Sequence, residues 1–344
     1  MTRPALTTLS DLTRAGLADP AAEPVLARVA ETFRIRISPA MQEAMETPDD
    51  PVGRQFVPDA AELTIRPEER TDPIGDRAHS PAPGLTHRYP DRVILHVTQT
   101  CDVYCRFCFR RETVGAAGPL PAPELAAALD YIAATPAVRE VILTGGDPLT
   151  LSARRLGALL GRLAGIAHVS VTRLHSRGPV VAPERITPAL IAALRAHPAT
   201  YLVVHINHAQ ELTPAARAAL ARLAEAGIPL LSQTVLLRGI NDDPATLEEL
   251  FRSLVALRVK PYYLHHCDLA RGTGHFRTTL AEGQVIMAAL RGRLSGLALP
   301  TYVLDIPGGH GKVPIGPDYL VRDGAGWQVT DPAGHHHRYD DPAR

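Results

Sequence analysis

Cys101-Asp102-Val103-Tyr104-Cys105-Arg106-Phe107-Cys108 is the stretch that decides the fold of this chain. It holds three of the four cysteines in 344 residues, and it directly follows the apolar run 92–97, which predicts a β-strand. Structural zinc takes four ligands, usually as two separated pairs, and disulfides need an even number of cysteines. Three cysteines at this spacing instead suit a [4Fe–4S] cluster, whose fourth iron can bind a small molecule.

The composition of the chain excludes several classes of protein. The formal net charge is zero and the pI is near 7.3, so no global field favours nucleic acid or an anionic membrane. No apolar run reaches the ~18 residues of a transmembrane helix, and the first residues lack the apolar core of a secretory signal. We therefore expect a cytoplasmic protein whose thiols stay reduced.

The regular part of the chain begins at residue 92, after an arm of short helices and a segment rich in proline and charge. We expect strands at 92–97, 140–144, 168–173, 200–206, 229–236 and 260–265. We expect helices at 121–135, 152–164, 187–197, 214–226 and 244–257. This alternation predicts a parallel α/β fold, and periodicity alone leaves open a partial barrel and an open doubly wound sheet. In both, chemistry belongs at the carboxyl ends of the strands.

Polar and glycine residues stand at the ends of several expected strands. They are Gly145, Gly146, Asp147, His205, Asn207 and His208, and Gln233 lies within the fifth strand. The two glycines could let the backbone approach a ligand, with the Asp147 carboxylate accepting from an ammonium group, or could form a plain turn capped by Asp147. Each of the others could be a satisfied polar group of the core, but together they predict contacts to a cofactor.

A second candidate centre is the glycine-rich segment Asp305-Ile306-Pro307-Gly308-Gly309-His310-Gly311-Lys312. It does not fit the nucleotide-binding patterns, because no serine or threonine follows the lysine and no clear helix comes next. A lysine on a close-approach loop suits covalent binding of pyridoxal phosphate. A surface lysine in a turn is the competing interpretation.

The Cys-x-x-x-Cys-x-x-Cys spacing after a first strand resembles the radical S-adenosylmethionine superfamily. With the segment 83–92 and the closing Pro-Gly-Gly-x-Gly-Lys, the chain resembles the lysine 2,3-aminomutase family over roughly residues 80–320. Further matching segments are 186–188, 236–242, 261–263 and 275–277. The resemblance implies a partial (β/α)6 barrel. It also implies three parts: an N-terminal arm at 1–80, the barrel at 81–295, and a C-terminal segment at 296–344 that carries the pyridoxal phosphate lysine.

The resemblance implies three cofactors and the residues that hold them. Cys101, Cys105 and Cys108 would bind a [4Fe–4S] cluster. Contacts to S-adenosylmethionine would come from Gly145, Gly146, Asp147, His205 and Gln233. Pyridoxal 5′-phosphate would be bound covalently by the catalytic Lys312, with help from Arg88, Tyr89 and Arg92.

The implied reaction interconverts L-lysine and β-lysine by radical 1,2-amino migration. Arg110 would pair with the carboxylate of the substrate, and Asp268 and Asp305 would receive its distal ammonium group. Glutamate-specific relatives replace the two aspartates, which argues against glutamate here. Arginine stays open, because a guanidinium group also pairs with two carboxylates. Two further hypotheses are a radical S-adenosylmethionine enzyme without aminomutase activity and a catalytically silent iron–sulfur scaffold.

The expected partners are the amino-acid substrate, an electron donor such as flavodoxin or ferredoxin, and further copies of the chain in a homo-oligomer. Neither nucleic acid nor a membrane is expected. Clostridial members of the family bind zinc through a cysteine that is Asp243 here, and through cysteines near the C-terminus; no cysteine follows Cys267. We therefore predict no zinc, and a packed thiol for Cys267. His265 replaces a common tyrosine, as in short relatives that make β-lysine for elongation factor P.

Overall fold

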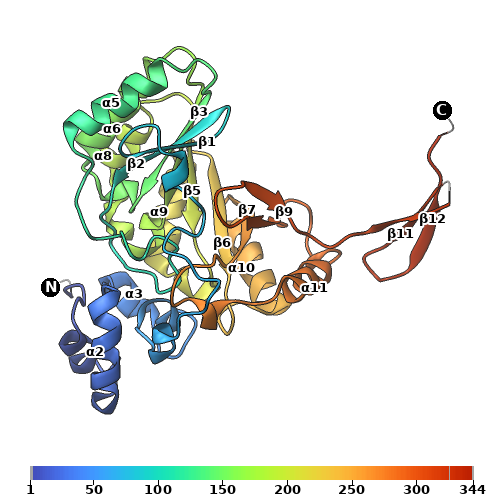
Figure 1. The fold of residues 1–344 in the computed structure, drawn as a ribbon, viewed down its shortest axis with the longest axis horizontal. Coiled ribbons are helices and arrows are strands. Elements are labelled where there is room, and N and C mark those ends of the chain that lie inside the picture. The colour runs from blue at the N-terminus through green and yellow to red at the C-terminus, as the bar shows by residue number, and fades with distance from the viewer. Residues whose placement is uncertain (1–2, 325, 343–344) are drawn as a thin grey trace.

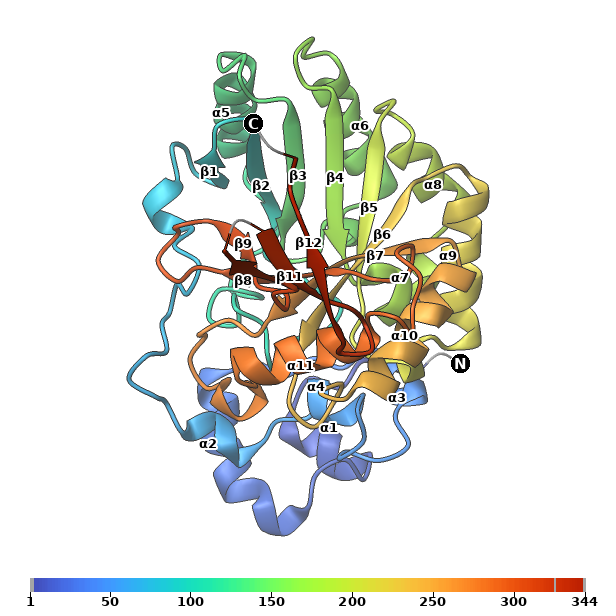
Figure 2. The same cartoon turned by 90° about the vertical axis from the view of Figure 1, so that its right-hand side faces the viewer.

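The computed structural model describes residues 3–324 and 326–342. Its centre is a nine-stranded sheet whose strands lie in sequence order from β1 to β9. The strands are β1 (Leu85–Tyr89), β2 (Arg92–Thr98), β3 (Glu140–Gly145), β4 (Val171–Ser176), β5 (Thr200–His205), β6 (Leu230–Leu236), β7 (Val259–His266), β8 (Thr301–Asp305) and β9 (Lys312–Pro314). Strands β2 to β8 run parallel, and β1 and β9 pair antiparallel at the two edges. The sheet is curled, with helices on its outer face (Figure 2).

The helices fall into two groups. The N-terminal arm contains α1 (Leu9–Arg14), α2 (Glu23–Thr32), α3 (Pro39–Ala44) and α4 (Gly53–Phe56). The barrel helices are α5 (Ala122–Ala133), α6 (Ala153–Ala164), α7 (Gly178–Val181), α8 (Pro188–Leu194), α9 (Pro214–Glu225), α10 (Pro244–Ala256) and α11 (Leu280–Leu290). The expected alternation of parallel strands and helices is confirmed, and the curled sheet decides for the partial barrel.

Two differences from the sequence-based prediction matter for the site. Strand β4 begins at residue 171 instead of 168, because the N–H of Val169 donates to the carbonyl of Ile166 and extends the preceding turn. The sheet also continues past the six predicted strands, so that Lys312 lies on β9 and pairs with Asp305 on β8.

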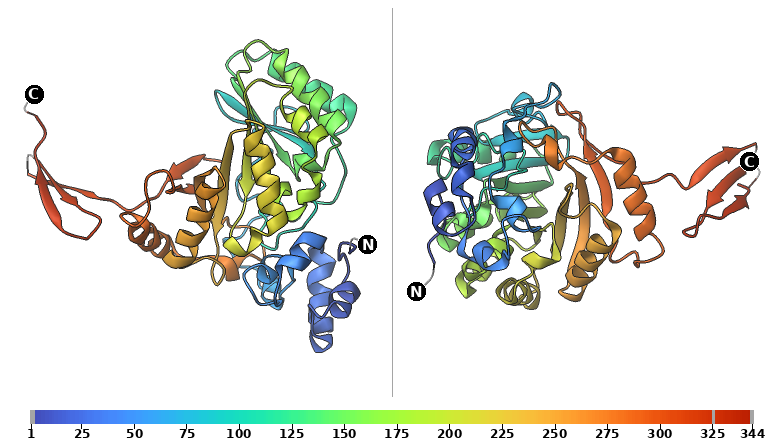
Figure 3. Two further views of the ribbon diagram at one scale, coloured as in Figure 1. Left: turned by 180° about the vertical axis from the view of Figure 1, so that it is seen from behind. Right: turned by 90° about the horizontal axis from the view of Figure 1, so that it is seen from below.

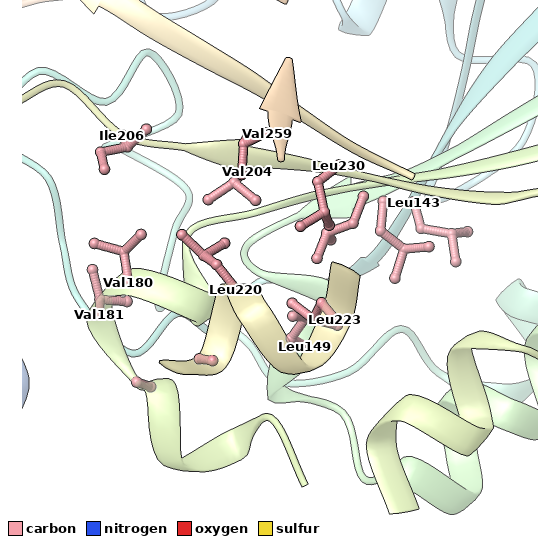
Figure 4. Close-up of a cluster of buried hydrophobic side chains, with 14 of the residues drawn as sticks. Leu143, Leu149, Val180, Val181, Val204, Ile206, Leu220, Leu223, Leu230 and Val259 are labelled. Atoms are coloured by element: carbon pink, nitrogen blue, oxygen red, sulfur yellow. The ribbon is translucent and has the colours of Figure 1, made fainter. Parts of the chain in front are cut away.

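The hydrophobic core lies between the sheet and its outer helices. Leu220 and Leu223 of α9 pack with Val204 of β5 and Leu230 of β6 (Figure 4). Alternate residues of each strand face opposite sides, so Val204 is buried in the core while its neighbour His205 faces the inside of the barrel. Fully burying one such apolar side chain contributes about 1.5–3 kcal/mol.

The two ends of the chain form separate features. Helices α1 to α4 lie at the end of the barrel toward which the parallel strands point (Figure 2). A second, antiparallel sheet of β10 (Leu320–Asp323), β11 (Gly326–Thr330) and β12 (His336–Tyr339) extends away from the body (Figures 1 and 3). In the part of the chain that the structure describes, no helix is long and apolar enough to cross a membrane.

Candidate active site

A cavity of about 850 Å³ lies inside the curled sheet. Its walls are the inward-facing residues of the strands and the loop of the three cysteines. Of the predicted cofactor and substrate residues, fifteen line it: Cys101, Cys105, Cys108, Arg88, Tyr89, Arg92, Arg110, Gly145, Gly146, Asp147, His205, Gln233, Asp268, Asp305 and Lys312. The two centres predicted separately from the sequence, the cysteine loop and the glycine-rich lysine loop, therefore share one cavity.

The cysteine loop is held in place from both sides. Arg106 donates to the carboxylate of Glu62 at 2.6–3.1 Å, and Arg111 pairs with the same carboxylate, which is fully buried. Arg185 donates to both oxygens of Asp102 at 2.7 Å. Since Glu62 belongs to the N-terminal arm, the arm fixes the backbone between the cysteines.

The thiols of the loop are half-buried, and one of them lies beside an arginine. Nη1 of Arg177 donates to Sγ of Cys105 at 2.9 Å, and Nη2 of Arg177 is held by Glu211 at 2.7 Å. Burial raises the pKa of all three thiols, that of Cys108 to about 11. A cationic group bound between the sulfurs would stabilise the thiolates, so these residues fit an iron–sulfur cluster.

Single metal ions are a different case. Among residues 3–324 and 326–342, no set of three or more histidine, cysteine or acidic side chains is arranged to hold one metal ion. Each cysteine of a [4Fe–4S] cluster binds a different iron, so its three sulfurs need not surround one point.

The segment Gly145-Gly146-Asp147 has a structural role of its own. A Cβ on Gly145 would lie 2.3 Å from the carbonyl oxygen of Thr98, and one on Gly146 would lie 2.3 Å from that of Thr100. The close approach of these glycines is therefore to the start of the cysteine loop. The Asp147 carboxylate accepts from the N–H groups of 149, 177 and 178 and from Oγ of Ser176, at 2.7–3.0 Å. The capped turn that the sequence also allowed is thus present.

The polar residues predicted at the end of β5 and on β6 separate into two kinds. His205 and Gln233 are register partners on neighbouring strands, and both line the cavity. Nε2 of His205 is buried and has no partner in the described chain, which leaves it available to a bound molecule. Asn207 and His208 do not line the cavity: Asn207 donates to Gln55 at 2.9 Å, and Nδ1 of His208 accepts from the backbone at 3.1 Å.

Lys312 projects into the cavity from β9. Its Nζ donates to Asp305, lies 3.2 Å from Nδ1 of His265 and sits over the ring of Tyr263 at 5.4 Å. Its backbone N–H donates to the hydroxyl of Tyr89 at 2.7 Å. Contacts with Asp305 of β8 and Tyr89 of β1 therefore fix Lys312, which is not a surface lysine in a turn.

The two predicted substrate carboxylates differ in charge state. Despite burial, His265 and Lys312 hold the pKa of Asp305 well below its usual range. Burial and the nearby charge of Asp305 raise the pKa of Asp268 to about 7. One carboxylate is thus ionised throughout the neutral range, while the other titrates within it.

Asp76 pairs with two of the three arginines that were predicted to bind anions. Its carboxylate accepts from Arg110 at 2.7 and 3.2 Å and from Arg88 at 3.1 Å. Asp76 belongs to segment 72–79, which also contacts the glycine-rich loop: Gly308 donates to the carbonyl of Pro73 at 3.1 Å. This segment therefore joins the lysine loop to the arginines.

The surroundings of Lys312 fit a phosphorylated cofactor. Nε of Arg88 is buried without a partner in the described chain, as expected of a donor that awaits an anion. Gly309 and Gly311 have φ values of +89° and +97°, and a Cβ on Gly309 would lie 2.8 Å from the His79 ring. Only glycine suits this loop, which brings the backbone against its neighbours beside Lys312.

Sequence reasoning missed three residues of this site: Asp76, His175 and Arg177. The Nε2 atom of His175 is buried in the cavity wall without a partner in the described residues. His175 and Arg177 lie beyond the predicted end of the third strand, which was set at 173. The alternation of Val171, Arg173 and His175 with buried residues would have placed that end correctly.

Comparison with known proteins gives two family matches. The Radical SAM superfamily matches residues 95–251, and the family described as Lysine-2,3-aminomutase matches residues 287–330. The L-lysine 2,3-aminomutase of Fusobacterium nucleatum is 44% identical to this chain, over 86% of this chain and 70% of its own.

Two further relatives bear on the substrate. The L-lysine 2,3-aminomutase of Clostridium subterminale is 43% identical over 86% of this chain and 72% of its own. The glutamate 2,3-aminomutase of Clostridioides difficile is 40% identical over 86% of this chain and 71% of its own.

Proposed function

Because this chain belongs to the lysine 2,3-aminomutase family of the radical SAM superfamily, we propose that it is an isomerase that interconverts L-lysine and β-lysine. The observation that carries the proposal is the shared cavity, in which the cysteine loop, Lys312 and the Asp268–Asp305 pair meet. A catalytically silent iron–sulfur scaffold would not need these three features in one cavity. An iron–sulfur enzyme of another kind would not need the lysine.

The proposed cofactors are a [4Fe–4S] cluster on Cys101, Cys105 and Cys108, S-adenosylmethionine beside His205 and Gln233, and pyridoxal 5′-phosphate on Lys312. When bound, they supply an adenosyl radical that removes hydrogen from the substrate and a carrier for the migrating amino group. The cluster takes up one electron, so we include a small electron-transfer protein such as flavodoxin or ferredoxin among the partners.

The chain itself binds and orients the substrate. The guanidinium group of Arg110 would bind the carboxylate of lysine, because it has donors beyond those that Asp76 uses. Asp268 and Asp305 would bind the distal ammonium group, which replaces the ammonium of Lys312 as the cation beside Asp305. Fixing both ends of the substrate holds the carbon atoms between them in one position.

The side chains around the cavity also exclude water. Phe107 is buried between two cysteines and packs edge-on against Phe276 at 6.2 Å. Together with Leu237, Ile240 and Cys267, these rings form a small apolar cluster beside the cysteine loop. An apolar cluster beside the cysteine loop keeps water away from reactive radicals and so prevents side reactions.

A substrate panel tests the proposal. The full chain would be reconstituted anaerobically with iron, sulfide and pyridoxal phosphate, reduced, and incubated with lysine, arginine or glutamate and S-adenosylmethionine. Mass spectrometry of the products should show β-lysine as the main β-amino acid. β-Glutamate as the main product would contradict the proposal, because the acid pair repels a side-chain carboxylate. β-Arginine as the main product would keep the aminomutase chemistry and change the substrate.

We also infer that the chain forms a homo-oligomer through the second sheet. Leu320, Val321 and Tyr339 are 55–57% exposed on it, and every residue of β10 and β12 is exposed. A three-stranded sheet with no packed face is marginal alone, which favours burial against another copy. Light scattering should show that Leu320→Asp with Val321→Asp lowers the molecular mass. Ile65→Asp, at an exposed apolar residue of the arm, serves as the control; an unchanged mass of the double variant would contradict the inference.

A further inference from the structure

The ammonium group of Lys312 has a second neighbour besides Asp305. Nδ1 of His265 lies 3.2 Å from Nζ of Lys312 and 3.5 Å from Oδ2 of Asp305. Lys312 can only donate, and the distance to Asp305 is long for a hydrogen bond from the ring. Nδ1 of His265 therefore accepts a hydrogen bond from Nζ of Lys312.

This arrangement fixes the state of the His265 ring. With Nδ1 accepting, the ring hydrogen lies on Nε2, which is buried and has no partner in the described chain. A neutral imidazole whose ring nitrogen accepts a hydrogen bond from an ammonium group is placed to act as a general base toward that group.

The charges around His265 favour proton transfer once Lys312 reacts. Burial lowers the pKa of His265, the charge of Lys312 lowers it further, and Asp305 raises it. The other neighbours are His175 and His205, whose pKa values burial lowers, and the ring of Tyr263 at 5.6 Å. When Lys312 loses its charge, the influence of Asp305 remains, so an imidazolium becomes more stable than before.

We propose that His265 takes a proton from Nζ of Lys312 when this lysine reacts with the aldehyde of pyridoxal phosphate, and then gives a proton to the departing aldehyde oxygen. The inference rests on the proposed function. Loss of one proton to Nδ1 gives Lys312 the free electron pair that forms the carbon–nitrogen bond. The aldehyde oxygen receives one proton from the nitrogen and one from His265, and leaves as water. His265 ends neutral, and the lysine nitrogen keeps the positive charge.

The test measures how fast the full chain binds pyridoxal phosphate covalently, by stopped-flow absorbance at several pH values. His265→Gln keeps polarity but cannot carry a proton, and it should slow binding on the order of a hundredfold. His265→Ala should be slow as well and should be accelerated by added imidazole. His266→Gln is the matched control, because this neighbour on β7 bonds to the Tyr302 hydroxyl at 2.8 Å and does not line the cavity.

A merely structural role of His265 gives a different pattern. The variants would then bind less cofactor at equilibrium, with the wild-type pH profile and no response to imidazole, which would overturn the inference. Equal rates in wild type and His265→Gln would overturn it too. Failure of the wild type to attach the cofactor at Lys312 would overturn both this inference and the proposed function. His265-dependent attachment in a protein that makes no β-amino acid would support the inference and overturn the function.

Discussion

The carboxylate of Asp76 accepts two hydrogen bonds from the guanidinium group of Arg110, at 3.2 Å from Nε and 2.7 Å from Nη2. The same carboxylate accepts from Arg88, so one residue of the N-terminal arm holds two cations of the cavity. Although Asp76 is largely buried, the charge of Arg110 holds the pKa of this carboxyl group below its usual range. The arm is therefore part of the site and not only a cover on the barrel.

Replacing Asp76 tests whether it positions Arg110 for the substrate. Asp76→Asn keeps the shape but loses the charge-assisted hydrogen bonds, which contribute about 1.5–3 kcal/mol each. We expect the KM for lysine to rise about tenfold, with a smaller change in kcat. Glu112→Gln is the control, because this carboxylate is two residues from Arg110 but pairs with Arg271 at 3.3 Å. A KM unaffected by Asp76→Asn would refute the positioning role.

The acid pair predicts a pH dependence of lysine binding. The pKa of Asp268 is raised to about 7, so this carboxyl group is neutral below that pH and cannot attract an ammonium group fully. The KM for lysine should fall as the pH rises through about 7. Asp268→Asn should remove this transition. Asp305→Asn should move it to lower pH, because the charge of Asp305 contributes to the raised pKa. Identical profiles for the two variants would contradict the assignment.

The raised pKa of Asp268 also predicts how the stability of the fold depends on pH. A carboxyl group whose pKa is raised by folding stabilises the folded state below its unfolded pKa of about 3.9, and this contribution is lost as the pH rises to about 7. The cofactor-free Asp268→Asn variant should therefore melt at a higher temperature than wild type at pH 8. Calorimetry that shows wild type to be the more stable protein at pH 8 would rule this out.

Glu62 should be essential for the fold around the cysteine loop. It is fully buried between Arg106 and Arg111, and removing its charge leaves two buried cations without their anionic partner. We expect Glu62→Gln to lower the free energy of unfolding by about 3–5 kcal/mol in denaturant titrations. Glu68→Gln, which removes an exposed pairing with Arg277, is the control and should change it by less than about 1 kcal/mol. Equal effects of the two substitutions would show that the buried charge has no special role.

Arg177 should tune the proposed cluster. Its hydrogen bond to Sγ of Cys105 withdraws electron density from the sulfur, which favours the reduced cluster. Arg177→Lys keeps a cation beside Glu211, but the shorter side chain loses the hydrogen bond to Cys105. We therefore expect a lower reduction potential of the cluster, measured in a redox titration followed by electron paramagnetic resonance. Arg185→Lys alters an ion pair to Asp102 in the same loop and should leave the potential unchanged. A potential that Arg177→Lys does not lower would exclude this role.

The order and type of the barrel elements follow from the sequence, because each unit is a local pattern. Alternating apolar residues define the strands, and Ser152, Thr187 and Thr213 cap the helices that follow them. Some cavity residues, such as Asp147 and His205, were found for the same reason: the carboxyl ends of parallel strands meet at one edge, so strand-end polar residues come together. Others, such as Arg110 and Asp268, were predicted only from the family resemblance.

Contacts between distant segments could not be read in this way. Asp76 meets Arg110 across 34 residues, and Arg177 meets Cys105 across 72, with no local pattern to connect them. Strands β8 and β9, which pair antiparallel with each other, are also short and are joined by the glycine-rich loop. Neither therefore shows a clear alternation of apolar and polar residues. From the sequence, Asp147 could contact a ligand or cap the turn that follows it. The four hydrogen-bond donors to its carboxylate, which only the structure reveals, show that it caps the turn.

The most direct test of the central claim follows the amino group itself. L-Lysine labelled with heavy nitrogen at the α position would be given to the reconstituted, reduced protein with S-adenosylmethionine, and the product would be analysed by mass spectrometry and NMR. We predict β-lysine with the label on carbon 3. Formation of 5′-deoxyadenosine without labelled β-lysine would contradict the proposed reaction.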